Sequence, residues 1–187
     1  MSKDYAALPR TQIRYMNRAV EDDAWIKAFL HKMPNGVLAT AHDGQPFALN
    51  NLFVYVETDN AIYMHTAQVG RTRANIEAAE QVCFTVSRIG RFLPYRKPVD
   101  FDVEYESVVV FGQASLVEDL AEKERVMWML LGKYAPHLKR GVDFDPIPME
   151  DLKRTSVYRI KIEEWSAKRN EAEPDFPGAY TYQIDEE

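Results

Sequence analysis

The segment from Ala61 to Val86, AIYMHTAQVGRTRANIEAAEQVCFTV, constrains the fold more than any other part of the chain. It reads as an apolar strand, a Gly-Arg-Thr-Arg turn that opens a short helix, and a second apolar strand. A helix N-terminus carries unpaired N–H groups and a partial positive charge, so a turn with Arg71 and Thr72 suits an anion such as phosphate. We therefore predict an anion site at residues 70–75.

The composition fits one globular domain that spans residues 1–187, with an N-terminal extension (1–20) and a C-terminal arm (171–187). With 187 residues, 46% of them hydrophobic, the chain can bury one sizeable core. A net charge of -6 argues against nonspecific nucleic-acid or anionic-membrane binding. No apolar run has membrane-spanning length, and the first residues lack the apolar core of a signal peptide, which predicts a cytoplasmic protein.

Hydrophobic periodicity predicts alternating helices and strands. An amphipathic helix is expected over Glu21–Met33, and Asp119 is expected to cap a second helix. The first three strands should form a meander, and Gly112 in the fifth should mark a bulge. The predicted strands are Gly36–Ala41, Phe47–Val56, Ala61–His65, Gln81–Ser87, Ser107–Leu116 and Val157–Ile162. Six or more mostly antiparallel strands with interspersed helices indicate a small α+β barrel.

Residues 88–106, RIGRFLPYRKPVDFDVEYE, are predicted to form a long loop. The loop holds four cations, which are Arg88, Arg91, Arg96 and Lys97. These cations fit ordinary solvated residues, and they also fit a surface that attracts an anionic substrate.

Three segments in order, GVLATAHDGQPFALNNLFVYV, AIYMHTAQVGRTRANIEAAEQVCFTV and YESVVVFGQASLVED, resemble the pyridoxamine 5'-phosphate oxidase-like FMN-binding split barrels. The chain is most similar to the branch that includes nitroimidazole-resistance proteins. The resemblance covers roughly residues 24–168. It implies an α+β fold, a mostly antiparallel split β-barrel with flanking helices, and a homodimer with FMN at the subunit interface.

The resemblance also implies roles for individual residues. His65 would lie beside the flavin as the candidate catalytic residue, and Arg71 and Thr72 would hold the phosphate. Family members often carry a basic residue where Thr72 stands, and this branch often carries proline where Asn50 stands. The candidate cofactor-binding residues are His65, Thr66, Gly70, Arg71, Thr72, Asn75, Asn50, Ser107, Trp165 and Lys168.

Several of these residues also have structural explanations. Arg71 and Arg73 fit solvated residues of a helix's first turn. His65 fits a half-buried strand residue with one structural hydrogen bond. Asn50 and Asn51 fit a bulge as well as a hydrogen bond to the flavin or substrate. No metal site is assigned, because the histidines lack ligand spacing.

Two classes of function fit these residues. The first is an FMN-dependent oxidoreductase, a flavin reductase or a nitroreductase-like enzyme, that uses NADH or NADPH to reduce a small organic substrate. The second is a binding or sensing protein of the same fold that carries FMN or haem without rapid turnover. For the homodimer, we expect a strand with Phe53 and Tyr55 to bury one face against a second copy.

Overall fold

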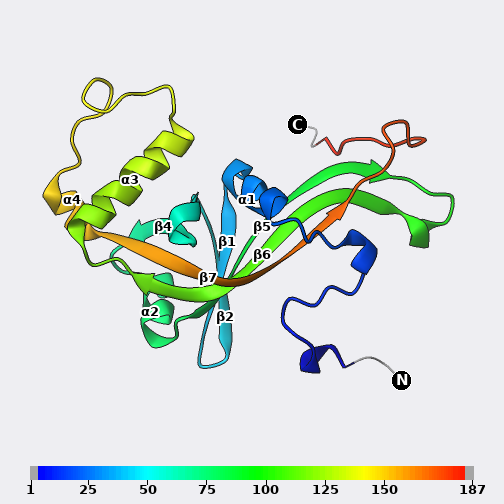
Figure 1. The fold of residues 1–187 in the computed structure, drawn as a ribbon, viewed down its shortest axis with the longest axis horizontal. Coiled ribbons are helices and arrows are strands. Elements are labelled where there is room, and N and C mark those ends of the chain that lie inside the picture. Colours follow the sequence, from blue (N-terminus) through cyan, green and yellow to red (C-terminus); the bar gives the residue numbers. More distant parts are fainter. Residues whose placement is uncertain (1–3, 184–187) are drawn as a thin grey trace.

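The computed structural model describes residues 4–183, which form one seven-stranded sheet with helices around it (Figure 1). All neighbouring strands are antiparallel, in the order β2-β1-β5-β6-β7-β4-β3. The strands are β1 (Gly36–His42), β2 (Gln45–Asn51), β3 (Val54–Val56), β4 (Ala61–Ala67), β5 (Gln81–Leu93), β6 (Asp102–Leu116) and β7 (Thr155–Asn170). The α+β split-barrel prediction is confirmed.

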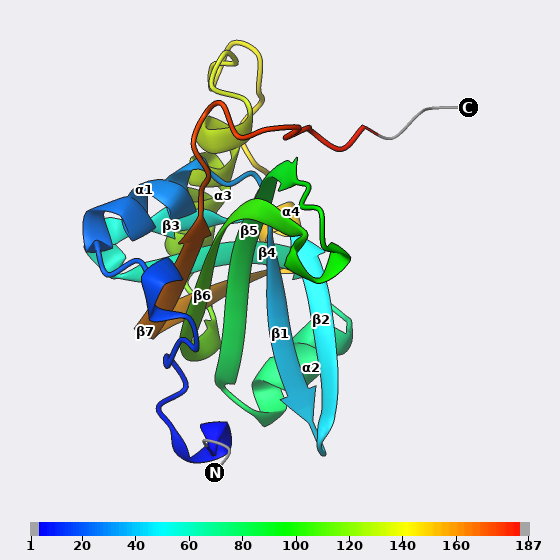
Figure 2. The same cartoon turned by 90° about the vertical axis from the view of Figure 1, so that its right-hand side faces the viewer.

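Four α-helices flank the sheet. Figure 2 shows α2 behind the lower halves of β1 and β2, away from α1 and α3. The bounds are α1 (Asp23–Lys32), α2 (Arg71–Ala78), α3 (Leu120–Tyr134) and α4 (Met149–Arg154), with short 3-10 turns at η1 (Tyr5–Ala7), η2 (Met16–Arg18), η3 (Glu57–Asp59) and η4 (Pro98–Asp100). Asp22 caps α1 and Asp119 caps α3 through their side-chain oxygens.

The sheet separates two apolar clusters. The larger one fills the barrel interior, with Phe53, Phe84 and Tyr158 fully buried. The smaller one lies between the outer face of β4 and β7 and the helix α3, and it includes Tyr63, Val126 and Leu130. Because side chains alternate along a strand, neighbouring residues of β4 belong to different clusters.

The predicted loop over residues 88–106 is wrong in its extent, because β5 and β6 continue as a long hairpin with a turn at residues 94–101. Figure 1 shows this hairpin reaching away from the barrel. Cross-strand ion pairs hold it, with Arg88 on Glu106 and Arg91 on Glu104. Glu104 accepts from Arg91 at 2.7 Å, and this bond keeps the pKa of the carboxyl low, at about 2.

The C-terminal arm folds back onto this hairpin. Arg91 donates to the carbonyl oxygens of Ala172, Glu173 and Pro174, and Phe92 exchanges two backbone hydrogen bonds with Tyr180. Residues 184–187 of the predicted arm lie outside the described part of the chain, as do residues 1–3 of the N-terminal extension. The described part of the extension contacts β7 at two places: Arg10 pairs with Glu163 and Glu164, and Ala19 bridges Lys168.

The predicted strand Phe47–Val56 and the three-stranded meander are also wrong. The chain leaves the ladder at Leu52 and Phe53, and β2 and β3 lie at opposite edges of the sheet order. The hydroxyl of Tyr134 accepts from the Phe53 N–H at 2.9 Å, and Lys133 donates to the Phe53 oxygen at 3.0 Å. We call this junction the seam, defined by residues 51–53 with Lys133 and Tyr134. A register shift confirms an irregularity at Gly112, but the extra residue is Glu163 of β7 rather than a residue of the predicted strand.

Two buried tyrosines differ in how their hydroxyls are bonded. The Tyr63 hydroxyl lies 2.8 Å from an Asp59 oxygen, and burial followed by this bond raises the pKa of Tyr63 to about 12. Arg125 donates to the same Asp59 oxygen. The hydroxyl of Tyr55 is buried and has no partner among residues 4–183. A bonded hydroxyl stabilises the fold, whereas a buried unbonded one costs desolvation energy.

We therefore predict opposite effects of removing the two hydroxyls. Tyr63→Phe should lower the free energy of unfolding by about 1–3 kcal/mol, because it removes one of the two donors to the Asp59 oxygen and leaves Arg125 as the other. Tyr55→Phe should leave the free energy of unfolding unchanged or raise it. Urea unfolding followed by circular dichroism measures both, and a loss of stability in Tyr55→Phe equal to that in Tyr63→Phe would contradict this assignment of the two hydroxyls.

Candidate functional site

The N-terminal turn of α2 presents free backbone donors and a free cation. Gly70 precedes the helix without a side-chain cap, and the first helical bond runs from the Ala74 N–H to the Gly70 oxygen. The N–H groups of the first turn therefore have no intrahelical acceptor. Arg71 is exposed and makes no hydrogen bond or ion pair with any residue from 4 to 183. This turn is the strongest candidate anion site in the described chain.

A cluster of hydroxyl groups lies beside this turn. Thr66 is at the end of β4, and its Oγ1 lies 2.9 Å from the Tyr158 hydroxyl. Its ladder partner Ser156 is buried, and Arg73 donates to the Ser156 oxygen at 3.3 Å. Arg73 also donates to Glu77 at 2.8 Å. Its guanidinium therefore already has hydrogen-bond partners, whereas that of Arg71 has none among residues 4–183. Sequence reasoning named Thr66 and missed Ser156 and Tyr158, which lie far from the helix in sequence.

Two of the candidate residues are turned toward the sheet. Thr72 and Asn75 are one helical turn apart, and they are 5% and 1% exposed. Asn75 donates to the hydroxyl of Thr40 at 2.9 Å, while its own Oδ1 is buried without a partner among the described residues. This geometry orients Thr72 toward β1 rather than toward solvent, which leaves Arg71 and the backbone N–H groups as the exposed donors of the turn.

His65 lies on the opposite face of β4 from Thr66. It shares the face of Tyr63 and of its ladder partner Val157, both in the outer cluster, whereas Thr66 shares the face of Met64 in the barrel interior. Burial lowers the pKa of His65, and its Nδ1 is buried without a partner among residues 4–183. A charged imidazolium is thus disfavoured at this position. The structure does not bring the His65 side chain to the hydroxyl cluster.

The paired asparagines have separate roles at the seam. Asn51 donates to the backbone oxygen of His65 at 2.7 Å, and its Oδ1 accepts from the Leu52 N–H at 2.8 Å. Asn50 is exposed and accepts from the side chain of Asn35 at 2.7 Å. The side chain that connects β2 to β4 is therefore that of Asn51, which is not among the predicted cofactor-binding residues.

The remaining candidates lie on another part of the sheet. Ala67, three residues before the turn of α2, pairs with Thr155 at the start of β7. Trp165 lies ten residues farther along β7, about 33 Å at the usual strand rise, and Lys168 lies beyond it, opposite Ser107. Trp165 donates its indole N–H to Asp23 at 2.9 Å, which ties it to α1. Within one protomer, the turn of α2 therefore lies far from Ser107, Trp165 and Lys168.

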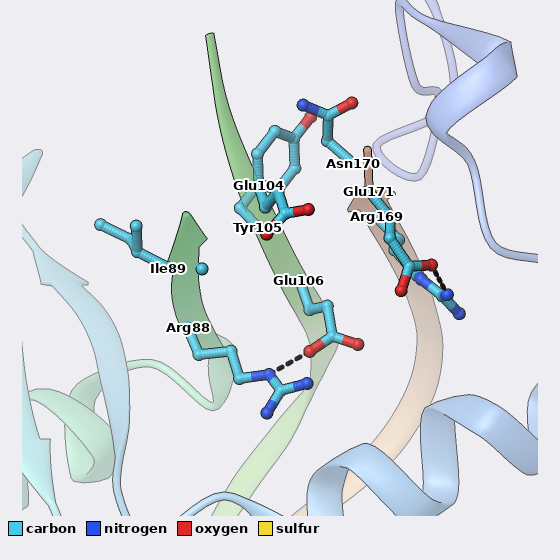
Figure 3. Close-up of a pocket in the computed structure, with 9 residues that line it drawn as sticks. Arg88, Ile89, Glu104, Tyr105, Glu106, Arg169, Asn170 and Glu171 are labelled. Carbon is cyan, nitrogen blue, oxygen red and sulfur yellow. Dashed lines mark hydrogen bonds and ion pairs between the residues drawn. The ribbon is translucent and has the colours of Figure 1, made fainter. Parts of the chain in front are cut away.

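A pocket with a volume of about 230 Å³ lies between the hairpin and the end of β7, and Figure 3 shows the side chains that line it. Figure 1 shows the hairpin reaching away from the part of the barrel that α2 covers. Charged side chains dominate its lining, and they pair with one another. Arg88 faces Glu106, and Arg169 faces Glu171. Among the four cations proposed to attract an anionic substrate, Arg88 and Arg91 are thus neutralised by carboxylates within the hairpin.

Metal-ligating side chains are not gathered at this site or elsewhere in the described residues. Within residues 4–183, no group of three or more histidine, cysteine, aspartate or glutamate side chains has the arrangement to hold a metal ion. None of the helices described has the length and apolar character needed to cross a membrane.

Comparison with known proteins identifies the family. A family model for pyridoxamine 5'-phosphate oxidase matches residues 22–169. The chain belongs to this family. A search of curated proteins found no significant match.

Solved structures similar to the chain include proteins that hold flavin or haem. The flavocytochrome Anf3 from Azotobacter vinelandii has a TM-score of 0.78 and 25% identity, over 95% of this chain and 86% of that one. The FAD- and haem-binding protein from Mycobacterium smegmatis has a TM-score of 0.74 and 18% identity, over 84% and 76% of the two chains. A putative 5-nitroimidazole antibiotic resistance protein from Bacteroides thetaiotaomicron has a TM-score of 0.67 and 18% identity, over 81% and 86%. The family and this fold include flavin-binding proteins.

The environment of His65 predicts its titration. Because burial lowers its folded-state pKa below the ordinary value, His65 should contribute stability above about pH 6.5 that is lost as the pH falls through the folded-state pKa. In an NMR titration, the His65 ring signals should shift at a pH below about 6.5, the ordinary value for histidine. His65→Asn should flatten the pH dependence of unfolding in that window, and an unchanged profile would show that His65 is not the group responsible.

Proposed function

We propose that this chain is an FMN-dependent oxidoreductase of the pyridoxamine 5'-phosphate oxidase family, with the flavin phosphate at the N-terminus of α2. The observation that supports this proposal most strongly is the group of unpaired hydrogen-bond donors at the N-terminus of α2. The Gly70 turn leaves N–H groups uncapped, and Arg71 has no partner in the described chain. An anion is the ligand that such a turn stabilises.

The residues around the turn fit a phosphate ester. Arg71 supplies a charge-assisted donor, and Thr66 supplies a hydroxyl that is already oriented by Tyr158. Asn75 keeps a buried oxygen, unpaired within residues 4–183, under the same turn. No carboxylate of the described chain pairs with Arg71 to compete for an anion, whereas Glu77 already occupies Arg73.

The proposed site requires a second copy of the chain. The group at α2 and the group of Ser107, Trp165 and Lys168 are too far apart in one protomer to meet one ligand. A two-fold homodimer can bring one group from each protomer to each flavin. The expected contact through Phe53 and Tyr55 does not support this dimer, because both side chains are buried within the protomer. Static light scattering tests the dimer, and a flavin-loaded monomer would rule out a shared site.

When bound, the flavin supplies hydride or electron transfer. The chain would bind its phosphate, exclude water from its ring and shape the substrate pocket. His65, if it meets the substrate, would act mainly as a neutral hydrogen-bonding group, since burial disfavours its charged form. A small organic acceptor such as a nitroaromatic or a quinone remains our proposed substrate class, with NADH or NADPH as the donor.

We predict that Arg71→Ala weakens flavin binding tenfold to a hundredfold, on the order of 1.5–3 kcal/mol for a lost charge-assisted contact. Titration of FMN followed by flavin fluorescence measures the affinity. Arg14→Ala is the matched control, because Arg14 is an exposed arginine of the N-terminal extension. Equal weakening in both variants, or none in Arg71→Ala, would remove Arg71 from the site.

The alternative is a protein that binds FMN, FAD or haem without rapid turnover. The similarity to the flavocytochrome, at 25% identity over 95% of this chain, favours testing haem directly. An absorption spectrum of the purified protein separates a flavin band from a haem Soret band. Extraction and chromatography of the released flavin then distinguish FMN from FAD.

Stopped-flow kinetics tests the oxidoreductase proposal itself. The flavin-loaded protein should oxidise NADH or NADPH in one half-reaction and reduce an acceptor in the other. His65→Ala should keep its flavin, because His65 lies on the opposite face of β4 from Thr66; a slower acceptor half-reaction would assign it a role at the substrate, and an unchanged one a structural role. If the flavin-loaded wild type oxidises no donor and reduces no acceptor across a broad panel, the binding alternative replaces the enzyme.

A further inference from the structure

A groove lies between the N-terminal extension, the start of α1 and the outer edge of β7. The strand β4 pairs with β7 as far as Lys161, and the extension reaches the same edge of β7 at Lys168. Between these two points, residues 163–167 have β6 as their one neighbouring strand in the described chain. Figure 2 shows the extension passing beside β7 and below α1. The groove left at this edge has a volume of about 360 Å³.

Apolar side chains make up most of the wall of this groove. Trp165 of β7 is partly buried against the barrel interior, and Ile26 of α1 is 2% exposed. Met16, on the opposite side, belongs to the extension and is 57% exposed. The other apolar residues of the lining are Pro9, Ile13, Ala19, Val20 and Ala167. A concave apolar wall of this kind suits the hydrocarbon part of a ligand.

The charged side chains that line the groove are two carboxylates, those of Glu21 and Asp23. Glu21 is exposed and makes no hydrogen bond or ion pair with any residue from 4 to 183. Asp23 accepts from the indole N–H of Trp165 at 2.9 Å but has no cationic partner within the same residues. Lys27 lies one helical turn from Asp23, yet its Nζ lies 2.7 Å from a Glu57 oxygen instead. The groove therefore carries negative charge that no ion pair of residues 4–183 compensates.

The nearby arginines of the extension do not supply the missing positive charge. Arg10 pairs with Glu163 and Glu164, and Arg18 pairs with Asp102. Neither arginine lines the groove, and no lysine or histidine of the described chain lines it. An apolar groove whose charged groups are all acidic favours a ligand that has both an apolar body and a positive charge.

We propose that the groove binds a small organic ammonium ion with an apolar body. The ammonium group would meet the carboxylates of Glu21 and Asp23, and the indole face of Trp165 would add a cation–π contact. An apolar cavity of about 150 Å³ holds benzene, so a groove of about 360 Å³ accommodates one aromatic ring with a short amine chain. The proposal does not rest on the flavin, because Trp165 is the one lining residue that the two proposals share.

Three probes with similar apolar bodies separate the effect of charge from that of apolar burial. At about pH 7 phenethylamine is a cation, 2-phenylethanol is neutral and 3-phenylpropionate is an anion. NMR titration of the purified protein follows the indole N–H signal of Trp165, which is assigned by its loss in Trp165→Phe. We expect phenethylamine to bind at least tenfold more tightly than 2-phenylethanol, because it adds charge-assisted contacts, and 3-phenylpropionate to give no saturable shift. Equal affinities for the amine and the alcohol, or no binding of the amine, would overturn the proposal.

Charge-removing variants assign the binding to this groove. Glu21→Gln and Asp23→Asn should each weaken phenethylamine binding about threefold to tenfold and leave 2-phenylethanol binding unchanged. Asp23→Asn keeps an oxygen that can accept from the Trp165 indole, so it removes the charge without removing this hydrogen bond. If both variants bind phenethylamine as tightly as the wild type, the carboxylates do not hold the amine and the proposal is wrong.

Two further variants serve as controls. Glu118 is exposed, lies outside the groove and has no ion pair within residues 4–183, so Glu118→Gln should leave phenethylamine binding unchanged. Arg71→Ala acts at the turn of α2 and should weaken flavin binding alone, which lets the flavin proposal and the amine proposal fail separately. If Glu118→Gln weakens phenethylamine binding as much as Glu21→Gln does, the amine responds to general surface charge and the groove is not its site.

Discussion

The closure of the barrel depends on side chains that replace a strand ladder. At the seam, β2 and β3 leave opposite edges of the sheet order, and residues between them pair with no strand of the described chain. A buried backbone amide without a partner is costly, so the Phe53 N–H needs an acceptor from elsewhere. Tyr134 supplies it from the end of α3, and Asn51 ties β2 to the backbone of β4. The position of α3 therefore fixes how the two edges meet.

This closure also determines the candidate site. Once Asn51 holds the His65 carbonyl, the end of β4 is fixed, and α2 begins a few residues later at Arg71. The alternation of side chains along β4 then places Thr66 over the interior and His65 over the outer cluster. An anion at α2 would meet Thr66 and Arg71, whereas His65 faces a different environment within the same protomer. The two residues predicted to act together at the end of β4, His65 and Thr66, therefore face opposite sides of the strand.

The sequence predicted the elements whose signals are local. The periodicity predicted α1, Asp119 was correctly expected to cap α3, and the glycine turn predicted the start of α2. The hairpin was missed because its stability comes from cross-strand pairs such as Arg91 with Glu104, which composition alone does not reveal. The break at Phe53 was missed because its hydrogen-bond partner is Tyr134, far along the chain. The opposite faces of His65 and Thr66 follow from the strand period, and this signal was available in the sequence.

The division of the candidate residues into two groups has a thermodynamic consequence. If each flavin is held by the α2 turn of one protomer and by Trp165 and Lys168 of the other, the ligand binds the assembled state more tightly than the separate protomers. A ligand with that preference stabilises the assembly by mass action, and assembly in turn raises the apparent affinity for the ligand. Flavin affinity should then increase with protein concentration near the dimer dissociation constant. A site complete within one protomer has no such dependence, so the concentration dependence of flavin affinity reports directly on how the two groups are shared.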